Sequence, residues 1–143
     1  MIAYDKNELE KLLQEIGNPK LLERIILTGY VVNTDLPAIY SLSRIFLYPS
    51  LRESFGIPIL EAMACGTAVI TSNTSSMPEV AGNAAILINP FKTEEITSAM
   101  IRLINDKVLF NNLKNEGLSQ AAKFSWKNMA KRVLDIYREI QIN

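Results

Sequence analysis

The amino-acid sequence predicts an α/β fold in which a parallel β-sheet is doubly wound, with helices on both of its faces. The segments with strand character, such as IFLYP and AAILIN, are mostly apolar throughout rather than alternating, which is typical of strands buried on both faces. Segments with helical periodicity separate them, and this order is typical of a parallel sheet. The chain of 143 residues is long enough for one domain with a hydrophobic core.

Two helices and two strands are expected in the first third of the chain. Apolar residues recur at helical spacing over residues 7–16, and the turn-forming sequence GNP ends this helix. The apolar run RIILTG, residues 24–29, predicts a buried strand. Residues 33–43 begin with the capping residues Asn, Thr and Asp and predict a short helix. Residues 45–49 predict the next buried strand.

The remaining chain is predicted to add two strands and four helices. A helix is expected from Ile57 to Cys65, because Pro58 stands near its first position, where a missing N–H costs nothing. Strands at residues 67–72 and 84–89 follow. The C-terminal third has helical stripes over residues 96–103 and 126–140, with a further helix between them from about Lys107 to Lys123. Trp126 begins the last stripe and is expected to lie in the core.

The predicted sheet is short for a domain of this class. About four strands are identified and the chain begins with a helix, whereas doubly wound nucleotide-binding sheets have about five or six strands. We therefore expect the N-terminal part of the domain to be absent. Because a shortened sheet leaves an unpaired edge and uncovered apolar surface, the chain is expected to self-associate or to be marginally stable.

Composition excludes several classes of function. Lys plus Arg and Asp plus Glu both number 15, so the net charge is zero, which argues against nucleic acid as the main partner. Because the chain has no histidine and one cysteine, a zinc site, an internal disulfide and histidine-based catalysis are excluded. The lone cysteine suits a reducing compartment, so we expect a cytoplasmic location. No apolar run approaches the ~18 residues of a membrane span.

The segment ESFGIPILE places two carboxylates, Glu53 and Glu61, eight positions apart around the start of a predicted helix. Ligands of open parallel sheets bind beyond the carboxyl ends of the strands, and the loop that holds Glu53 follows such a strand. The free N–H groups and the positive dipole end of the helix suit an anion, above all a phosphate. Gly56 has no side chain, so a ligand could approach the backbone closely.

A nucleotide sugar would fit this combination. It has phosphates in its middle and polyols at both ends, and carboxylates accept hydrogen bonds from vicinal hydroxyls. Other interpretations stay open: Glu61 as an exposed glutamate favoured by the helix dipole, Glu53 as a solvated loop charge, and Phe55 as a core residue. The hydroxyls of SNTSS, residues 72–76, could bind a sugar or form turns, and turns are the commoner use.

The residues from Phe46 to Pro90, FLYPSLRESFGIPILEAMACGTAVITSNTSSMPEVAGNAAILINP, closely resemble the C-terminal domain of GT-B glycosyltransferases. The resemblance is to the retaining family known as glycosyl transferases group 1, or family 4, whose E-x7-E signature stands here as ESFGIPILE. KFSWKNMAKRVLDIY matches the closing helix of that family, so the resemblance covers essentially the whole chain. It implies a Rossmann-like sheet, the C-terminal half of the GT-B fold, incomplete at its N-terminus.

The resemblance implies transfer of a sugar from a UDP- or GDP-linked donor with retention of configuration, and without a metal or other cofactor. By position, Glu53 would contact the transferred sugar and stabilise charge, as a catalytic residue that is not a covalent nucleophile. Glu61 would bind the ribose, and Val31 would lie where the family reads the nucleobase with its backbone. The backbone expected to hold the sugar and the diphosphate is that of Ser54, Phe55, Gly56 and Ile57.

The departures from the family pattern imply an incomplete enzyme. Family members carry an Arg and a Lys in the first strand–helix unit of this domain, and no such pair can be assigned here. The N-terminal domain that supplies the acceptor site is also missing. We therefore expect residues 1–143 to be a partial nucleotide-sugar-binding domain of a hexosyltransferase, inactive alone.

The resemblance also suggests where the complete protein acts. It would build a polysaccharide or a glycolipid, with a glycan or lipid-linked acceptor, and SNTSSMPEV resembles mannosyltransferase-like members, which implies mannose as the sugar. Basic residues exceed acidic ones in the C-terminal stretch, which would suit peripheral association of the full-length protein with the inner face of a membrane; a solvated helix face is the commoner reason.

Two other functions are compatible with the sequence. The first is a nucleotide-sugar-binding or interaction module without activity, which the missing Arg and Lys favour. The second is a nucleotide-sugar epimerase of related fold, which ranks low because such enzymes generally use acid–base side chains that include histidine, and this chain has none.

Overall fold

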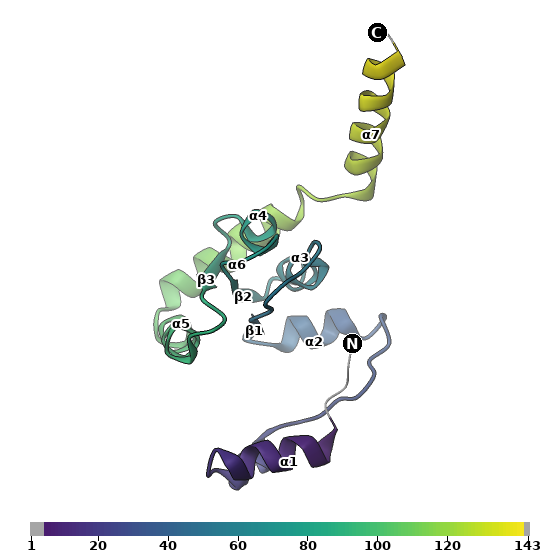
Figure 1. The fold of residues 1–143 in the computed structure, drawn as a ribbon. Helices are drawn as coiled ribbons and strands as arrows, with labels where there is room; N and C mark the ends of the chain where they lie inside the picture. The colour runs from purple at the N-terminus through teal and green to yellow at the C-terminus, as the bar shows by residue number, and fades with distance from the viewer. Residues whose placement is uncertain (1–4, 142–143) are drawn as a thin grey trace. The chain divides into compact units, whose positions relative to one another are not determined.

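The computed structural model describes residues 5–141 and divides into two compact units, one up to Leu36 and one from Pro37 onward (Figure 1). The first unit contains α1 (Lys6–Glu15) and a 3-10 helix, η1 (Pro19–Arg24), which pack against each other. The side chain of Asp5 caps α1 by accepting a hydrogen bond from the Asn7 backbone N–H at 3.0 Å. The first predicted helix is confirmed.

The strand predicted at residues 24–29 is wrong. Ile25 has an extended backbone, with φ −108° and ψ 124°, but residues 25–29 pair with no strand in the part of the chain that the structure describes. Ile26 is 88% exposed. A strand needs a partner ladder and a covered face, and an apolar run does not reveal whether either is present.

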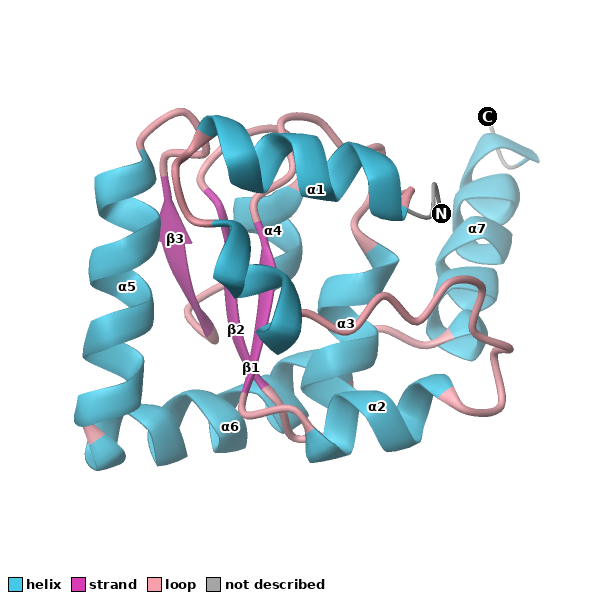
Figure 2. Ribbon diagram, turned by 90° about the horizontal axis from the view of Figure 1, so that it is seen from below, coloured by secondary structure: helices cyan, strands magenta, loops and turns pink. Residues whose placement is uncertain are grey.

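The second unit is an α/β fold with one parallel sheet of three strands in the order β1-β2-β3. Figure 2 shows the strands side by side, with α5 along β3. The parallel sheet with flanking helices is confirmed; the described sheet has three strands rather than four. Its elements are α2 (Leu36–Leu42), whose first residue is the last of the first unit, β1 (Ile45–Tyr48), α3 (Ile57–Ala64), β2 (Ala68–Ser72), α4 (Met77–Ala81), β3 (Ala85–Ile88), α5 (Thr93–Asn105), α6 (Lys107–Ala121) and α7 (Trp126–Gln141).

The central strand, β2, is buried along its whole length. On one face of the sheet, Ile70 packs with Leu103 of α5 and Leu113 of α6, and Ile45 and Leu47 of β1 lie against the same cluster. Because successive residues of a strand point to opposite faces, the intervening residues of β1 lie on the other face. This alternation brings two aromatic side chains of β1 together there, as described below.

The expectation that Trp126 lies in the core is wrong, since it is 80% exposed. The rest of the apolar stripe of α7 is exposed as well, and α7 has no extensive packing partner among residues 5–141. The periodicity correctly predicts an amphipathic helix but does not show what covers its apolar side. None of the described helices has the length and the apolar character that crossing a membrane would require.

Candidate functional site

The candidate site lies at the carboxyl edge of the sheet, in the connection between β1 and α3. This loop begins at Pro49 and ends at Gly56, the residue before α3. Glu53 lies in the loop and Glu61 lies on α3. The position agrees with the expectation for a ligand site in an open parallel sheet.

The carboxylate of Glu53 is held by two hydroxyl groups. Tyr48 Oη donates to Glu53 Oε1 at 2.5 Å, and Ser50 Oγ donates to the same oxygen at 3.0 Å. Glu53 is partly buried, and its Oε2 accepts no hydrogen bond from any residue that the structure describes. Glu53 is therefore an ordered side chain with one free oxygen, rather than a loop charge surrounded by solvent.

The carboxylate of Glu61 is held in a similar way. Tyr40 Oη donates to Glu61 Oε2 at 3.1 Å, while Oε1 accepts no hydrogen bond within residues 5–141. Tyr40 belongs to α2 and is buried, with an exposed fraction of 7%. Glu61 itself is exposed, so it has room for a ligand as well as for water.

The two tyrosines belong to one row of aromatic side chains. Phe46 stacks on Tyr48 with ring centroids 5.6 Å apart, and Tyr40 meets Phe46 edge-on at 5.3 Å. Burial, reinforced by the hydrogen bond to Glu53, raises the pKa of Tyr48 to about 12. Burial, followed by the charge of Glu61, also raises the pKa of Tyr40. Both hydroxyls therefore stay protonated at neutral pH and remain donors.

Between the two carboxylates, four successive backbone N–H groups are unused. Those of Ser54, Phe55, Gly56 and Ile57 donate to no other group in the described part of the chain. Gly56 precedes α3 with φ 99°, a left-handed conformation. A Cβ atom at Gly56 would lie 3.2 Å from Ile59 Cδ1. The loop thus presents polar backbone where the family resemblance implies that the sugar and the diphosphate bind.

Three hydroxyl groups of the SNTSS segment are hydrogen-bonded to the backbone of this loop, whereas the buried Ser72 Oγ has no hydrogen-bond partner among the described residues. Thr74 Oγ1 donates to Leu51 O at 3.2 Å, and Ser75 Oγ donates to Glu53 O at 2.7 Å. The Ser76 hydroxyl has one hydrogen and lies 2.9 Å from Phe55 O and 3.1 Å from Glu53 O. These residues brace the loop, which agrees with the interpretation as turn chemistry.

Sequence reasoning missed the side chains that hold the glutamates and their loop. Tyr40 and Tyr48 looked like apolar residues of a helix and a strand, and their hydrogen bonds were not predicted. A signal was present in the strand, because Tyr48 is its last residue and ligands lie beyond that end. No local signal pairs Tyr40 with Glu61, since they are 21 residues apart in the sequence.

Phe55 is partly exposed and packs against another aromatic side chain. Its ring meets the ring of Phe124 edge-on at 5.9 Å, and 37% of its surface is exposed. With Trp126 and Met129 it lines an apolar hollow of about 450 Å³. Val31 lies in the first unit, so its contact with a nucleobase stays a prediction.

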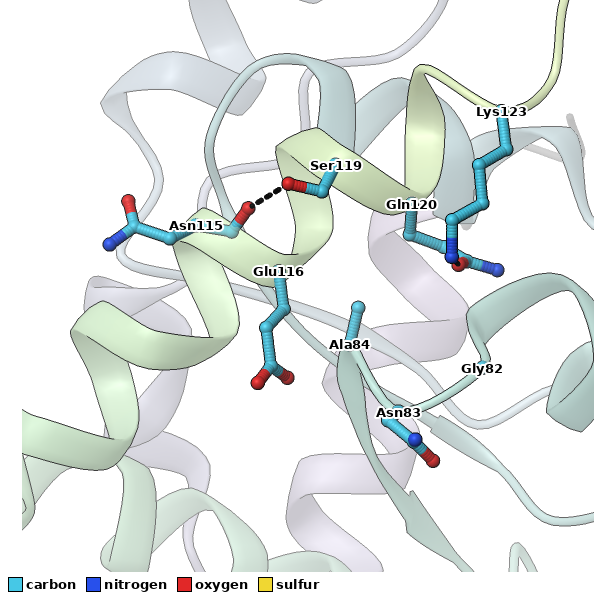
Figure 3. Close-up of a pocket in the computed structure, with 8 residues that line it drawn as sticks. All are labelled: Gly82, Asn83, Ala84, Asn115, Glu116, Ser119, Gln120 and Lys123. Atoms are coloured by element: carbon cyan, nitrogen blue, oxygen red, sulfur yellow. Dashed lines mark hydrogen bonds between the residues drawn. The ribbon is translucent and has the colours of Figure 1, made fainter.

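A second hollow, of about 480 Å³, lies beside the start of β3 (Figure 3). Two of its polar side chains are used internally: Lys123 Nζ donates to Gln120 Oε1 at 2.8 Å, and Gln120 Nε2 donates to Val80 O at 2.9 Å. Ala84 precedes β3, whereas Glu53 follows β1, so in a parallel sheet the two regions belong to opposite edges. This hollow is not part of the candidate site.

The chain is similar to known proteins over most of its length. Residues 1–133 match the family model described as glycosyl transferases group 1. The serotype-specific mannosyltransferase WbdA of Escherichia coli is 41% identical over 133 residues, which cover 91% of this chain and 16% of that protein. This chain therefore spans about a sixth of the length of that relative.

The solved structures that are similar to the chain include the following two. Sucrose-phosphate synthase from Thermosynechococcus elongatus superposes with a TM-score of 0.81 and 27% identity, over 95% of this chain and 34% of that one. The C-terminal domain of a glycosyl transferase group 1 family protein (LpcC) from Francisella tularensis superposes with a TM-score of 0.68 and 29% identity, over 82% and 60% of the two chains.

Proposed function

Because the chain belongs to the glycosyl transferases group 1 family, we propose that it is the donor-binding part of a retaining glycosyltransferase. One observation carries this proposal: a run of four unused backbone N–H groups lies between two carboxylates, each held by a tyrosine and each with one free oxygen. The donor is a nucleotide sugar, and its sugar passes to a glycan or lipid-linked acceptor.

Each part of the site suits one part of the donor. The N–H groups from Ser54 to Ile57 and the start of α3 bind the diphosphate, since a helix N-terminus combines free donors with a positive dipole end. Glu53 accepts hydrogen bonds from the transferred sugar, and Glu61 accepts them from the ribose. No side chain is needed at Gly56, where the phosphates pass close to the backbone.

Glu53 acts through its charge in this proposal. Positive charge develops on the sugar ring as its bond to the phosphate breaks, and a fixed carboxylate nearby stabilises it. Because Tyr48 and Ser50 already hold the carboxylate, little reorganisation is required when the charge appears, which is the condition for effective electrostatic catalysis. The acceptor hydroxyl attacks from the face that the nucleoside diphosphate leaves, the departing phosphate takes the acceptor proton, and no covalent intermediate forms on Glu53.

The identity of the transferred sugar and the location of the acceptor site are proposed from the relatives. WbdA is named a mannosyltransferase, which supports mannose as the transferred sugar. The chain covers a minor part of that relative, so we assign the acceptor site, and the cations that neutralise the diphosphate, to other parts of a full-length enzyme. Residues 1–143 are then one part of the donor domain and are inactive alone.

The test is made in the full-length transferase. Replacing Glu53 by Gln removes the charge but keeps the shape, and should lower the transfer rate about 100-fold or more, since the interaction matters mainly in the transition state. Glu116→Gln, an exposed carboxylate on α6, is the matched control and should leave the rate unchanged. Near-normal transfer by the Glu53→Gln enzyme contradicts the proposal.

Ligand-observed NMR with a panel of UDP-, GDP- and ADP-sugars identifies the donor. Binding of one nucleotide sugar with measurable transfer supports an enzyme. Binding without transfer, in the complete protein, indicates a nucleotide-sugar-binding module instead. If no member of the panel binds, the donor-site assignment is wrong.

A further inference from the structure

We propose that Tyr48 and Tyr40 are positioning residues of this site, each holding one oxygen of its glutamate so that the other oxygen faces the donor. The inference rests on the proposed function, because it takes Glu53 and Glu61 as the groups that bind the sugar and the ribose. Phe46 links the two tyrosines, so the spacing of the two carboxylates is set by one aromatic row.

At Glu53, one carboxylate oxygen accepts two hydrogen bonds and the other accepts none from the described residues. Both Tyr48 Oη and Ser50 Oγ donate to Oε1, at 2.5 and 3.0 Å. A hydrogen bond to a charged carboxylate is stronger and more directional than one between neutral groups. With its torsion fixed in this way, Oε2 is directed to the remaining side, where it accepts no hydrogen bond from residues 5–141.

The contact at Glu61 has the same form with a more deeply buried donor. Tyr40 Oη reaches Oε2 at 3.1 Å from a ring that is almost fully buried. Glu61 is on the exposed side of α3 and has no ion-pair partner among the described residues. A flexible, exposed glutamate would lose side-chain entropy on binding, and the fixed hydroxyl reduces this loss by ordering it beforehand.

The positions of both tyrosines are fixed by the central strand. Thr71 Oγ1 donates to the backbone O of Tyr48 at 3.0 Å, and Thr67 Oγ1 donates to that of Tyr40 at 2.5 Å. Both threonines belong to the buried segment that contains β2. Phe46 packs between the two tyrosine rings. The tyrosines that hold the two carboxylates are thus anchored to β2 and the residue before it, and not only to the loop and the helix that carry the glutamates.

The two tyrosine hydroxyls should affect different steps, which a purely structural role would not predict. Tyr48→Phe keeps the ring and its stacking and removes only the donor to Glu53. In the full-length transferase it should lower kcat by about tenfold or more, the effect of one charge-assisted hydrogen bond. The Kd for a nucleoside diphosphate, which has no transferred sugar, should change less than about twofold.

Tyr40→Phe should instead weaken binding and leave kcat nearly unchanged. The Kd for the nucleoside diphosphate should rise by about tenfold, since the ribose loses an ordered acceptor, while kcat at saturating donor stays within about twofold. Tyr137→Phe, an exposed tyrosine of α7, is the matched control for loss of a hydroxyl and should leave both quantities unchanged. If Tyr48→Phe impairs folding, Ser50→Ala removes the other donor to Glu53 Oε1 and should lower kcat in the same way.

A double-mutant cycle separates this inference from the proposed function. If Tyr48 acts through Glu53, then Tyr48→Phe added to Glu53→Gln should lower the rate no further than Glu53→Gln does alone. Fully additive losses, or equal effects of the two Tyr→Phe changes on kcat and on Kd, overturn the positioning role. If Glu53→Gln leaves transfer unchanged, the proposed function itself fails, whatever the tyrosine variants do.

Discussion

The side chain of Ser75 is hydrogen-bonded to both backbone polar groups of Glu53. Its hydroxyl donates to Glu53 O at 2.7 Å and accepts from Glu53 N–H at 3.3 Å. Ser75 has φ 57° and lies in the left-handed region although it is not a glycine. That conformation costs about 1 to 3 kcal/mol. It occurs at the residue whose hydroxyl holds the backbone of Glu53.

Two substitutions at Ser75 separate the hydroxyl from the backbone strain. Ser75→Ala loses both hydrogen bonds and keeps the unfavourable φ, so it should lower the free energy of unfolding by about 1 kcal/mol. Ser75→Gly loses the same bonds but relieves the strain, so it should be more stable than the Ala variant by about 1 kcal/mol. Urea unfolding measures the difference. Equal stability of the two variants would show that the strain is absent.

Gly56→Ala should weaken donor binding. The new Cβ atom would lie 3.2 Å from Ile59 Cδ1, and the backbone has φ 99°, which an alanine rarely adopts. Relief of the backbone strain and of this contact should shift the loop, and with it the N–H groups assigned to the diphosphate. We expect the Kd for a nucleoside diphosphate to rise by about tenfold or more, measured by calorimetry. Gly17→Ala, at a helix end in the first unit, controls for loss of a left-handed glycine.

Stability at high pH should depend on Tyr48. Its pKa is raised from the ordinary 10.0 to about 12, so the folded state favours the protonated hydroxyl. The resulting stabilisation is fully present below about pH 10 and is lost as the pH rises from about 10 towards 12. The difference in unfolding free energy between the normal protein and Tyr48→Phe should therefore shrink over that range. A difference that stays constant from about pH 9 to 12 contradicts this.

Gln120→Ala should destabilise the second unit without affecting the donor site. Its side-chain N–H group donates to Val80 O at 2.9 Å in a buried position, so the variant leaves a buried carbonyl unpaired, at a loss of about 1 to 3 kcal/mol. Asn115→Ala, exposed on the same helix, is the control and should change stability little. Thermal unfolding measures both. If Gln120→Ala changed donor affinity but not stability, the hollow that Gln120 lines would belong to the donor site, and this prediction would be wrong.

The 143-residue chain is expected to self-associate when prepared alone. β1 has one partner, β2, in the described sheet, so its other edge offers unpaired backbone groups. The exposed apolar stripe of α7 adds to this tendency. Sedimentation velocity over a concentration series should show dimers or larger species. A single monomeric species with a high Tm would be evidence against this expectation.

Most elements of the second unit could be predicted because their signals are local. β1, α3, β2 and β3 each have a short apolar run or a proline at a helix start, and the structure places them within a few residues of the prediction. The positions of Glu53 and Glu61 relative to α3 follow from the same local pattern. Their roles in binding and catalysis stay predictions.

The errors and omissions concern contacts between distant residues. Residues 24–29 were expected to form a strand, but a strand depends on a partner that the run itself does not specify. Trp126 was expected in the core, but periodicity does not identify what covers a helix. Ser75 and Glu53 are 22 residues apart in the sequence, so their hydrogen bonds follow only from the crossover between β1 and β2.

Every described side chain that is hydrogen-bonded to either glutamate, or to the loop between them, lies in one continuous stretch from Tyr40 to Ser76. The stretch includes two successive parallel strands and the helix that joins them. Exchanging these residues as a block between relatives should therefore transfer the spacing of the two carboxylates intact. Exchanging α3 alone should separate Glu61 from the Tyr40 hydroxyl that orients it. Exchanging the serine loop alone should separate the backbone of Glu53 from the Ser75 hydroxyl that holds it, so chimaera boundaries belong outside this segment.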